Sequence, residues 1–304
     1  MDWRRLADEL GQKVQGRVFS RVLMKEHTAW RVGGPADLLL IPETEDDVLR
    51  VLDYAGEHGL PVTVIGNGSN LLVRDGGIRG LTLKIAGGLA TYQVQGNKIE
   101  AGAGILLPHL ARLAFRSELS GLEFGLGIPA SLGGALIMNA GAFGQQLGEL
   151  VGEVKTVNFN GVRRVWDRLQ LSFSYRRSSL QDQNLIILKT VLFLNPAQAS
   201  AIAERMERNL SCRKKSQPLD LPTAGSVFRN PPNCYAGQLI EMAGLKGLRL
   251  GDAQVSQKHA NFIVNLGNAT ASQIIALMEI IQERVKNQFG VSLEPEVRVV
   301  GEEG

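Results

Sequence analysis

A stretch of small residues at positions 125–144 restricts the fold more than any other part of the chain. It reads Gly-Leu-Gly-Ile-Pro-Ala-Ser-Leu-Gly-Gly-Ala over residues 125–135 and continues as Asn-Ala-Gly-Ala-Phe-Gly over residues 139–144. Side chains this small let the main chain approach a neighbour closely, either a packed strand or a flat aromatic ligand. Packing alone explains a stretch of this length poorly, so the pattern favours a ligand-binding segment. Ser131 is placed to cap a short helix inside it.

The same stretch matches a dinucleotide-binding pattern formally, at Gly125, Gly127 and Ala130. We reject this match because Pro129 lies inside it and no clear strand precedes it, whereas the glycine-rich turn of that motif directly follows a strand. The segment is therefore not expected to be the phosphate loop of a doubly wound fold.

A second glycine cluster occupies residues 66–70 and reads Gly-Asn-Gly-Ser-Asn. It follows the apolar run 61–65, which predicts a buried strand. Glycines after a strand let successive N–H groups surround a phosphate or pyrophosphate. The same residue types are also usual in solvent-exposed turns, so this cluster alone does not decide between the two.

Periodicity and capping residues predict a mixture of helices and strands. Thr44 is expected to cap a helix over 45–58, and Thr270 with Gln273 forms a capping box for a helix over 271–289. Two more helices are predicted at 107–116 and 197–213. Strands are predicted at 81–85, 92–95, 98–101, 185–194, 262–266 and 294–300, and Asn160-Gly161 joins 153–159 to 162–166 in a hairpin. Antiparallel hairpins among helices indicate an α+β chain, and 304 residues need two or three packed subdomains.

Composition excludes several classes of function. The formal charge of +3 is small, which argues against nucleic acid, and no apolar run is long enough to span a membrane. We therefore expect a cytoplasmic protein with an anionic small-molecule ligand. Cys212 and Cys234 stand alone, and the four histidines lack metal-ligand spacing. We therefore expect neither a metal site nor a redox-active pair of cysteines.

Three further segments are weak signals by themselves: 175–178, 224–231 and 293–298. Taken in order with the two glycine clusters and with segments 28–36 and 243–247, they resemble the UDP-N-acetylenolpyruvoylglucosamine reductase family. The resemblance extends over nearly the whole chain. It implies an FAD-binding fold of the vanillyl-alcohol-oxidase (PCMH) type in two subdomains, residues 1–83 and 84–196, plus a C-terminal α+β substrate domain at 197–304.

The resemblance also implies a reaction. NADPH reduces noncovalently bound FAD, and hydride then passes to the enolpyruvyl ether of UDP-N-acetylglucosamine enolpyruvate, which yields UDP-N-acetylmuramate for peptidoglycan synthesis. The family's catalytic residues fall on Ser226, Arg176 and Glu296. Ser226 donates a proton to carbon, Arg176 holds the carboxylate and stabilises the enolate, and Glu296 fixes geometry or shares a proton. Arg229 or Lys246 is expected to stabilise the serine alkoxide.

Binding residues carry over in the same way. The pyrophosphate of FAD is expected on Gly66, Asn67, Gly68, Ser69 and Asn70, and the flavin on Ile128, Ser131, Gly134, Ala135, Asn139, Gly141 and Ala142. The UDP-sugar is expected on Tyr175, Arg229, Gln238, Glu241 and Lys246.

Two departures from the family pattern are present. Ser216 stands where many relatives carry a lysine, so Lys214 or Lys215 is the alternative phosphate contact, and the inserted tyrosine loop of the long form of the family is absent. Two other functions stay open, an FAD oxidase of the same fold and a nucleotide-sugar sensor without activity. The oxidase is disfavoured because neither glycine cluster contains a histidine for covalent flavin attachment.

Overall fold

The computed structural model describes residues 1–181 and 183–304, which form two compact units. Unit 1 consists of Met1–Ser20, Leu38–Asn67 and Gly80–Cys212, and unit 2 of Arg21–Asp37, Gly68–Arg79 and Arg213–Gly304. Each unit is therefore assembled from segments that are distant in the sequence. The three consecutive domains expected from the sequence are a different partition, and their bounds stay a prediction.

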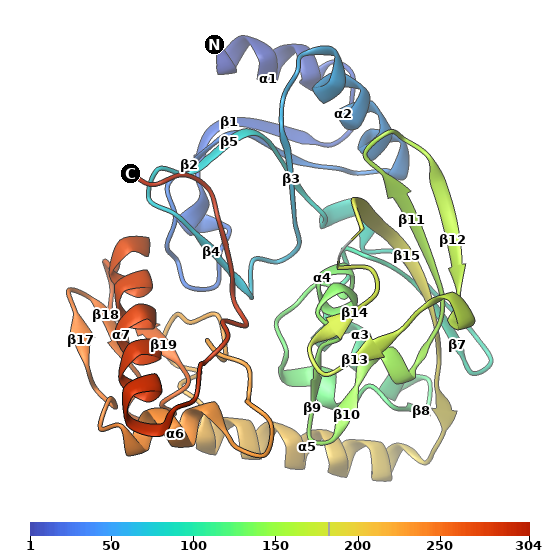
Figure 1. Ribbon diagram of the computed structural model, residues 1–304. Helices are drawn as coiled ribbons and strands as arrows, with labels where there is room; N and C mark the ends of the chain where they lie inside the picture. Colours follow the sequence, from blue (N-terminus) through green and yellow to red (C-terminus); the bar gives the residue numbers. More distant parts are fainter. Residues whose placement is uncertain (182) are drawn as a thin grey trace. The chain divides into compact units, whose positions relative to one another are not determined.

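A five-stranded antiparallel sheet forms the framework of unit 1 (Figure 1). Its order is β12 (Arg163–Asp167), β11 (Val151–Asn158), β15 (Leu185–Phe193), β7 (Lys98–Gly102) and β6 (Tyr92–Gln95). The central strand β15 is the long β-branched run predicted as an interior strand, and β11 and β12 form the hairpin predicted at Asn160-Gly161.

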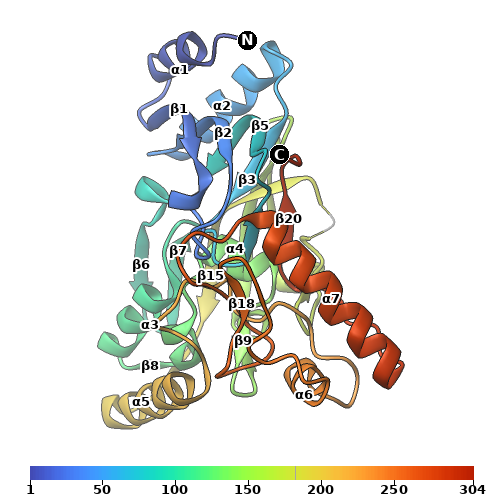
Figure 2. The same cartoon turned by 90° about the vertical axis from the view of Figure 1, so that its left-hand side faces the viewer.

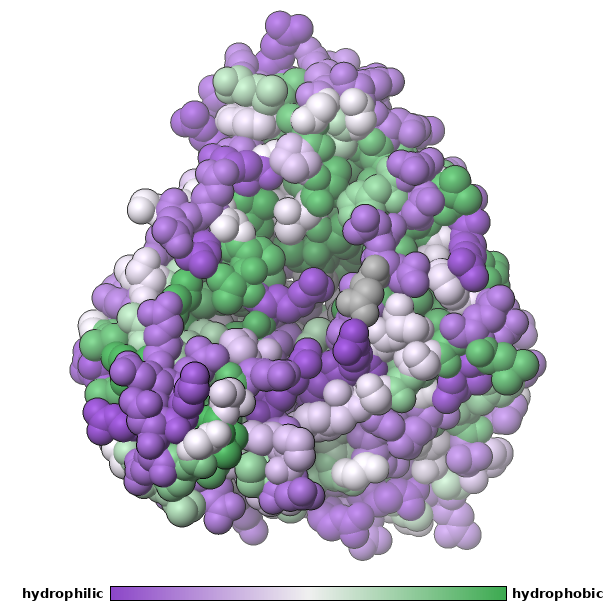
Figure 3. Space-filling view, in the orientation of Figure 1, coloured by the Kyte–Doolittle hydropathy of each residue, from purple (hydrophilic) through white to green (hydrophobic). Residues whose placement is uncertain are grey.

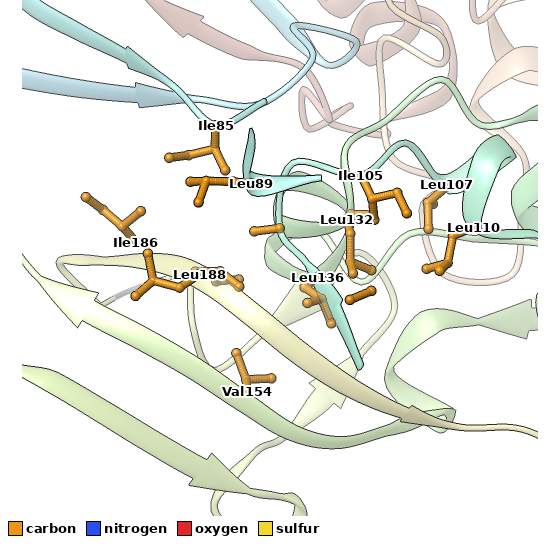
Figure 4. Close-up of a cluster of buried hydrophobic side chains, with 14 of the residues drawn as sticks. Ile85, Leu89, Ile105, Leu107, Leu110, Leu132, Leu136, Val154, Ile186 and Leu188 are labelled. Atoms are coloured by element: carbon orange, nitrogen blue, oxygen red, sulfur yellow. The ribbon is translucent and has the colours of Figure 1, made fainter. Parts of the chain in front are cut away.

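The small-residue stretch is held against this sheet by α4 (Leu132–Ile137) and α3 (Leu107–Arg116). Figure 4 shows Leu132 and Leu136 of α4 among buried side chains of the sheet and of α3. Gly133 N donates to Ala103 O at 2.9 Å, and a Cβ at Gly133 would lie only 3.0 Å from the Ala103 Cβ. Glycine is thus required for α4 to lie this close to the chain that leaves β7.

Unit 1 also contains α1 (Trp3–Gly11), α2 (Glu45–Glu57), most of α5 (Ala199–Ser216) and several short strand pairs. A second sheet has the order β1 (Arg17–Leu23), β2 (Pro35–Ile41), β5 (Ile78–Lys84) and β3 (Val62–Ile65). Strands β3 and β5 pair in parallel, so the loop after β3 leaves from the same sheet edge as the chain after β5.

Unit 2 packs a three-stranded antiparallel sheet against α7 (Ala271–Phe289). The sheet order is β17 (Arg249–Leu250), β18 (Ala253–Val255) and β19 (Ile263–Asn265), and Figure 2 shows α7 as the long helix of this unit. The unit also holds α6 (Ala236–Met242) and the parallel pair β20 (Arg298–Val300) and β4 (Leu71–Val73). Thr270 and Gln273 form the predicted capping box of α7, and Gly290 ends the helix at φ 70°.

Most predicted elements are confirmed, and three differences are seen. The sequence analysis missed α1, β1 and β2. The strand predicted at 294–300 is wrong in its first half, because only β20 pairs as a strand and Pro295 makes an isolated bridge with Phe228. Residues 294–296 bind residues 227–229 around this bridge, and pairing with β4 begins only at Arg298. The helix predicted at 197–213 begins and ends later, at 199 and 216.

In the part of the chain that the structure describes, no helix combines the length and the apolar character needed to cross a bilayer. Hydrophilic and hydrophobic residues are intermixed on the face drawn in Figure 3.

Asp47 fixes the start of α2 and supports a test of the fold. Its buried carboxylate accepts hydrogen bonds from the main-chain N–H groups of Gln15, Gly16, Glu43 and Thr44, at 2.9–3.2 Å. Burial alone would raise the pKa of the Asp47 carboxyl, but these four hydrogen bonds outweigh it and hold the pKa below its ordinary value.

We expect Asp47→Asn to lower the free energy of unfolding at pH 7 by about 2 kcal/mol, since an amide lacks the charge and cannot accept from both sides. Because the folded-state pKa is lowered, the stabilisation is present above the unfolded pKa of about 3.9 and is lost as pH falls through the folded value. The difference between wild type and variant in denaturant unfolding should therefore shrink from pH 7 to pH ~3. Asp46→Asn is the matched control, because that exposed neighbour makes only a surface ion pair with Arg163. An equal loss in both variants would contradict this account.

Candidate active site

In unit 1 the first glycine cluster begins directly against the small-residue stretch. Gly66 follows β3, and a Cβ at this position would overlap the Ser131 side-chain oxygen. The Asn67 side-chain amide donates to Pro129 O at 2.7 Å. Segments 60 residues apart in the sequence thus meet at Gly66 and Ser131, the two positions at which the sequence analysis expects pyrophosphate and flavin.

Ser131 is the residue before α4 but does not cap it with its side chain. The residue is buried, with only 2% of its surface exposed, and its Oγ has no hydrogen-bond partner among the described residues. The helix start predicted at Ser131 is confirmed, whereas the capping role predicted for its hydroxyl is wrong. A buried hydroxyl without a partner costs about 1–3 kcal/mol, so a bound ligand that supplies one would be stabilised here.

Asn139 ties the end of α4 to the hairpin that carries Arg176. Its buried amide donates to Gln146 Oε1 and to Ser174 O, each at 2.8 Å, and its Oδ1 accepts from Gly148 N at 2.8 Å. The side chain of Asn139 is therefore engaged within the protein. The flavin contact expected at this residue stays a prediction, and it would have to come from the main chain.

Arg176 lies in a two-residue turn between β13 (Phe173–Ser174) and β14 (Arg177–Ser178). Its φ is +55°, an unusual value for arginine, and its guanidinium lies 5.0 Å from the centroid of the Tyr175 ring. Gln181 Nε2 donates to Arg176 O at 3.1 Å and to Ile137 O at 2.8 Å. In this strained turn the main chain of Arg176 is thus bonded to Gln181, and its side chain contacts the Tyr175 ring.

In unit 2 the structure brings Ser226 and Glu296 onto adjacent main-chain segments. Glu296 N donates to Val227 O at 2.7 Å, and Arg229 N donates to Glu294 O at 2.9 Å. Residues 227–229 therefore run antiparallel to residues 294–296, with Val227, the residue after Ser226, opposite Glu296. The third predicted catalytic residue, Arg176, belongs to unit 1, and its place beside these two stays a prediction.

Asn70, the last residue of the first glycine cluster, is attached to the same segment of unit 2. Its Nδ2 donates to Glu296 O at 3.0 Å, and its carbonyl accepts from Arg298 N at 3.0 Å. Gly68 has φ +69°, and a Cβ there would overlap His27 O. Glycine is required at Gly68 on both grounds, whether or not a phosphate binds.

Three of the residues expected to bind the UDP-sugar, Gln238, Glu241 and Lys246, lie on α6 or in the loop after it, whereas Tyr175 belongs to unit 1. Lys246 Nζ lies 2.7 Å from Glu241 Oε1, and Arg229 Nη1 lies 3.7 Å from Glu294 Oε2. Gln238 is exposed on α6. The His259 ring lies against Gly237, where a Cβ would be 3.0 Å from its Cε1. Burial lowers the pKa of the His259 imidazole, the Lys246 ammonium lowers it further, and Glu241 opposes this.

The alternative phosphate contacts at the end of α5 lie beside a cavity of unit 2. Lys214 lines this cavity of 460 Å³ together with Lys258 and Ser256. Lys258 Nζ donates to Lys214 O at 2.6 Å, so one ammonium is held at the carboxyl end of the helix. Whether Lys214 or Lys215 replaces the lysine missing at Ser216 stays a prediction.

Comparisons with known proteins match both parts of the chain. An FAD binding domain model matches residues 36–165, and the C-terminal domain of UDP-N-acetylenolpyruvoylglucosamine reductase matches residues 217–300. The reductase of Desulforamulus reducens is 44% identical over 303 residues, covering 100% of both chains. That of Moorella thermoacetica is 45% identical over 302 residues, covering 99% of both. This chain belongs to the UDP-N-acetylenolpyruvoylglucosamine reductase family.

A solved structure of the same family supports the fold. The crystal structure of the reductase from Thermus caldophilus has a TM-score of 0.82 and 40% identity, and the match covers 93% of this chain and 99% of that one. Together with the FAD binding domain, it confirms the α+β, FAD-binding fold of the vanillyl-alcohol-oxidase type expected from the sequence.

The residues of unit 1 fit the flavin cofactor of the family. Gly66 leaves room where any side chain would meet Ser131, and the Ser131 hydroxyl is buried without a partner. Ile128, Gly134, Gly141 and Ala142 are each partly exposed, so main chain and small side chains are available to a flat ring system. Ala135, expected in the same set, is buried in the core.

Sequence reasoning missed the residues that hold the candidate site from behind. Gln181 supports the Arg176 turn, and Ser178 Oγ donates to Ile137 O at 2.8 Å. The Ser178–Ile137 hydrogen bond joins residues 41 positions apart, and no local pattern marks it. The one sequence feature that could have indicated Ser178 and Gln181 is that both follow the Tyr175-Arg176 pair closely along the chain.

We expect Gly66→Ala to weaken FAD binding about tenfold or more, because the added Cβ forces the Ser131 hydroxyl out of its position and overpacking costs about 1–3 kcal/mol. Fluorescence titration of the apoprotein with FAD measures the effect. Gly56→Ala is the control, since its Cβ would meet nothing within 4 Å. Adding Ser131→Ala to Gly66→Ala should recover part of the affinity, because the two Cβ atoms would then lie 3.5 Å apart. Wild-type affinity in Gly66→Ala would show that Gly66 is not part of the cofactor site.

Proposed function

We propose that this chain catalyses the FAD-dependent, NADPH-driven reduction of UDP-N-acetylglucosamine enolpyruvate to UDP-N-acetylmuramate, a step of peptidoglycan precursor synthesis. Full-length identity of 44–45% to reductases named for this substrate supports it. The observation that carries it is the hydrogen bonding of the main chain directly after Ser226 to the segment that contains Glu296, because the reaction needs a proton donor and a carboxylate in one site. A cytoplasmic location, consistent with these water-soluble substrates, belongs to the same proposal.

Bound FAD would supply hydride to the terminal carbon of the enolpyruvyl group. The electron pair of the double bond then moves to the neighbouring carbon and is delocalised into the substrate carboxylate. Arg176 is the group proposed to hold that carboxylate, because a fixed guanidinium binds a carboxylate through two parallel hydrogen bonds and stabilises developing charge. The contact between its guanidinium and the Tyr175 ring restricts the Arg176 side chain before the substrate binds.

Ser226 completes the reaction by donating its hydroxyl proton to the carbanionic carbon. The alkoxide left behind needs a nearby positive charge and is reprotonated from solvent. Arg229, three residues further along the same segment, is one source of that charge, and Lys246 is the other. Glu296 is proposed to orient the substrate or the serine hydroxyl by hydrogen bonding.

The proposal is tested with the purified protein under anaerobic conditions. NADPH should bleach the visible flavin band, and UDP-N-acetylglucosamine enolpyruvate should restore it, whereas UDP-N-acetylglucosamine, which lacks the double bond, should not. Acid denaturation should release the flavin into the supernatant, as expected for noncovalent binding. A colourless protein would instead favour a sensor, and oxidation of an alcohol or sugar with oxygen would favour an oxidase.

We expect Ser226→Ala to separate the two half-reactions. Flavin reduction by NADPH needs no proton donor to carbon and should stay within about twofold of wild type. Reoxidation by the enolpyruvyl substrate should fall by about 10²-fold or more, the usual scale for the loss of general acid catalysis. Stopped-flow absorbance measures both steps separately. Equal losses in both would mean that Ser226 has a structural role.

Glu296→Gln and Glu294→Gln test the register of the C-terminal segment. Glutamine keeps the shape of the side chain and removes its charge. Glu294 is 76% exposed and lies 3.7 Å from Arg229, so its replacement should change turnover less than about threefold. Glu296 is half-buried and lies opposite Val227, so Glu296→Gln should lose at least about tenfold in the second half-reaction. A larger loss for Glu294 would move the assignment by two residues.

A further inference from the structure

Asn261 binds the main chain of the two residues that directly follow Ser226, the proposed proton donor. It is 3% exposed and lies in the loop that leads into β19. Its Oδ1 accepts from Phe228 N at 3.0 Å, and its Nδ2 donates to Phe228 O at 2.8 Å. Its main-chain carbonyl also accepts from Val227 N at 2.8 Å. One residue therefore satisfies three main-chain groups of the two residues that follow Ser226.

The opposite edge of the same segment is bonded to the segment that carries Glu296. Val227 O accepts from Glu296 N at 2.7 Å, which leaves Asn261 as the partner on the other side. Residues 227 and 228 are thus hydrogen bonded along both edges, like a residue of a central strand, although one edge is formed by a side chain.

The chain turns at Gly225, directly before Ser226. Gly225 has φ +80°, and a Cβ placed there would meet no heavy atom within 4 Å. Glycine is the residue with the widest conformational freedom, so this position alone does not fix the direction of the chain at Ser226. The hydrogen bonds at residues 227 and 228 restrain Ser226 from its other side. A serine hydroxyl lies only one rotatable bond beyond the Cα, so its reach depends directly on that main chain.

We infer that Asn261 is a positioning residue for the proton transfer: its side-chain amide holds the main chain at Phe228 so that the Ser226 hydroxyl meets the reacting carbon. This inference rests on the proposed function. A misplacement of about 1 Å is enough to cost a reaction about 10²-fold, because proton transfer requires the donor within hydrogen-bond distance.

His259 supports Asn261 from its other side. Asn261 N donates to His259 Nδ1 at 3.2 Å, so the ring accepts at Nδ1 and carries its proton on Nε2. The lowered pKa of His259 agrees with this neutral form. The ring also packs against Phe262, with centroids 4.8 Å apart, which fixes the loop that presents Asn261.

The test compares Asn261→Ala with Asn265→Ala. Asn265 is an equally buried asparagine four residues away, whose amide holds Trp30 O, Gly267 N and Ala269 N instead. Both variants lose buried hydrogen bonds and should lose stability similarly in thermal unfolding. In Asn261→Ala alone, reoxidation of the reduced enzyme by UDP-N-acetylglucosamine enolpyruvate should slow at least about tenfold, with flavin reduction by NADPH within about twofold of wild type. The solvent deuterium isotope effect on reoxidation should rise, because proton transfer then limits the step.

A double-mutant cycle decides whether Asn261 acts through Ser226. In the Ser226→Ala background, Asn261→Ala should change reoxidation by less than about twofold, because the group that it positions is already gone. Additive losses, or equal slowing of both half-reactions, would overturn the inference and give Asn261 a purely structural role. Failure of the wild type to be reoxidised by the enolpyruvyl substrate would instead overturn the proposed function. Wild-type rates in Asn261→Ala, with a defective Ser226→Ala, would overturn only the inference.

Discussion

Close approach of main chain to main chain is the constraint on which the candidate site depends. In unit 1 it occurs where Gly133 N reaches Ala103 O and where Gly66 meets Ser131. A side chain at either glycine would displace its neighbour, so the small-residue stretch cannot lie against β7 and β3 unless these positions stay glycine. The hydrophobic side chains of α4 stabilise the stretch from the core side, which leaves its backbone and its smallest side chains to the ligand side.

Asparagine side chains supply the hydrogen bonds to the main chain where regular strand pairing ends. Asn139 holds Ser174 before the Arg176 turn, Asn70 holds Glu296, and Asn261 holds Phe228. An amide offers a donor and an acceptor in one plane, as a peptide group does, so it can bind one edge of an extended segment without continuing the strand. An extended segment of the candidate site can thus be hydrogen bonded along one edge and still end after one or two residues.

How much of this was predictable depends on the range of the interactions. Helices α2, α3 and α7 were predicted within a residue or two, because capping residues and apolar periodicity are local signals. The hairpin at Asn160-Gly161 is local in the same sense. Strand β1 was missed because its exposed positions include Phe19 and Leu23, so apolar and polar residues do not alternate along it. Strand β2 was missed because a short apolar run cannot be told from a buried helical segment by periodicity alone. The site residues came from ordered motifs, whereas the asparagine contacts join residues up to 226 positions apart and leave no trace in local sequence.

The strand wrongly predicted over 294–300 shows which information the local sequence lacks, namely the partner to which each residue is hydrogen bonded. Alternation predicted one strand over 294–300, but Pro295 has no N–H, and the segment before β20 bonds residues 227–229 instead of a sheet. Ending the strand there leaves Glu296 N and Glu294 O free to bind the Ser226 segment on one edge, while β20 pairs with β4 from residue 298 onward. Proline at 295 thus separates two pairing partners along a single extended segment. Residues 294–296 bind the segment after Ser226, and residues 298–300 bind β4, so this one segment joins both of them within unit 2.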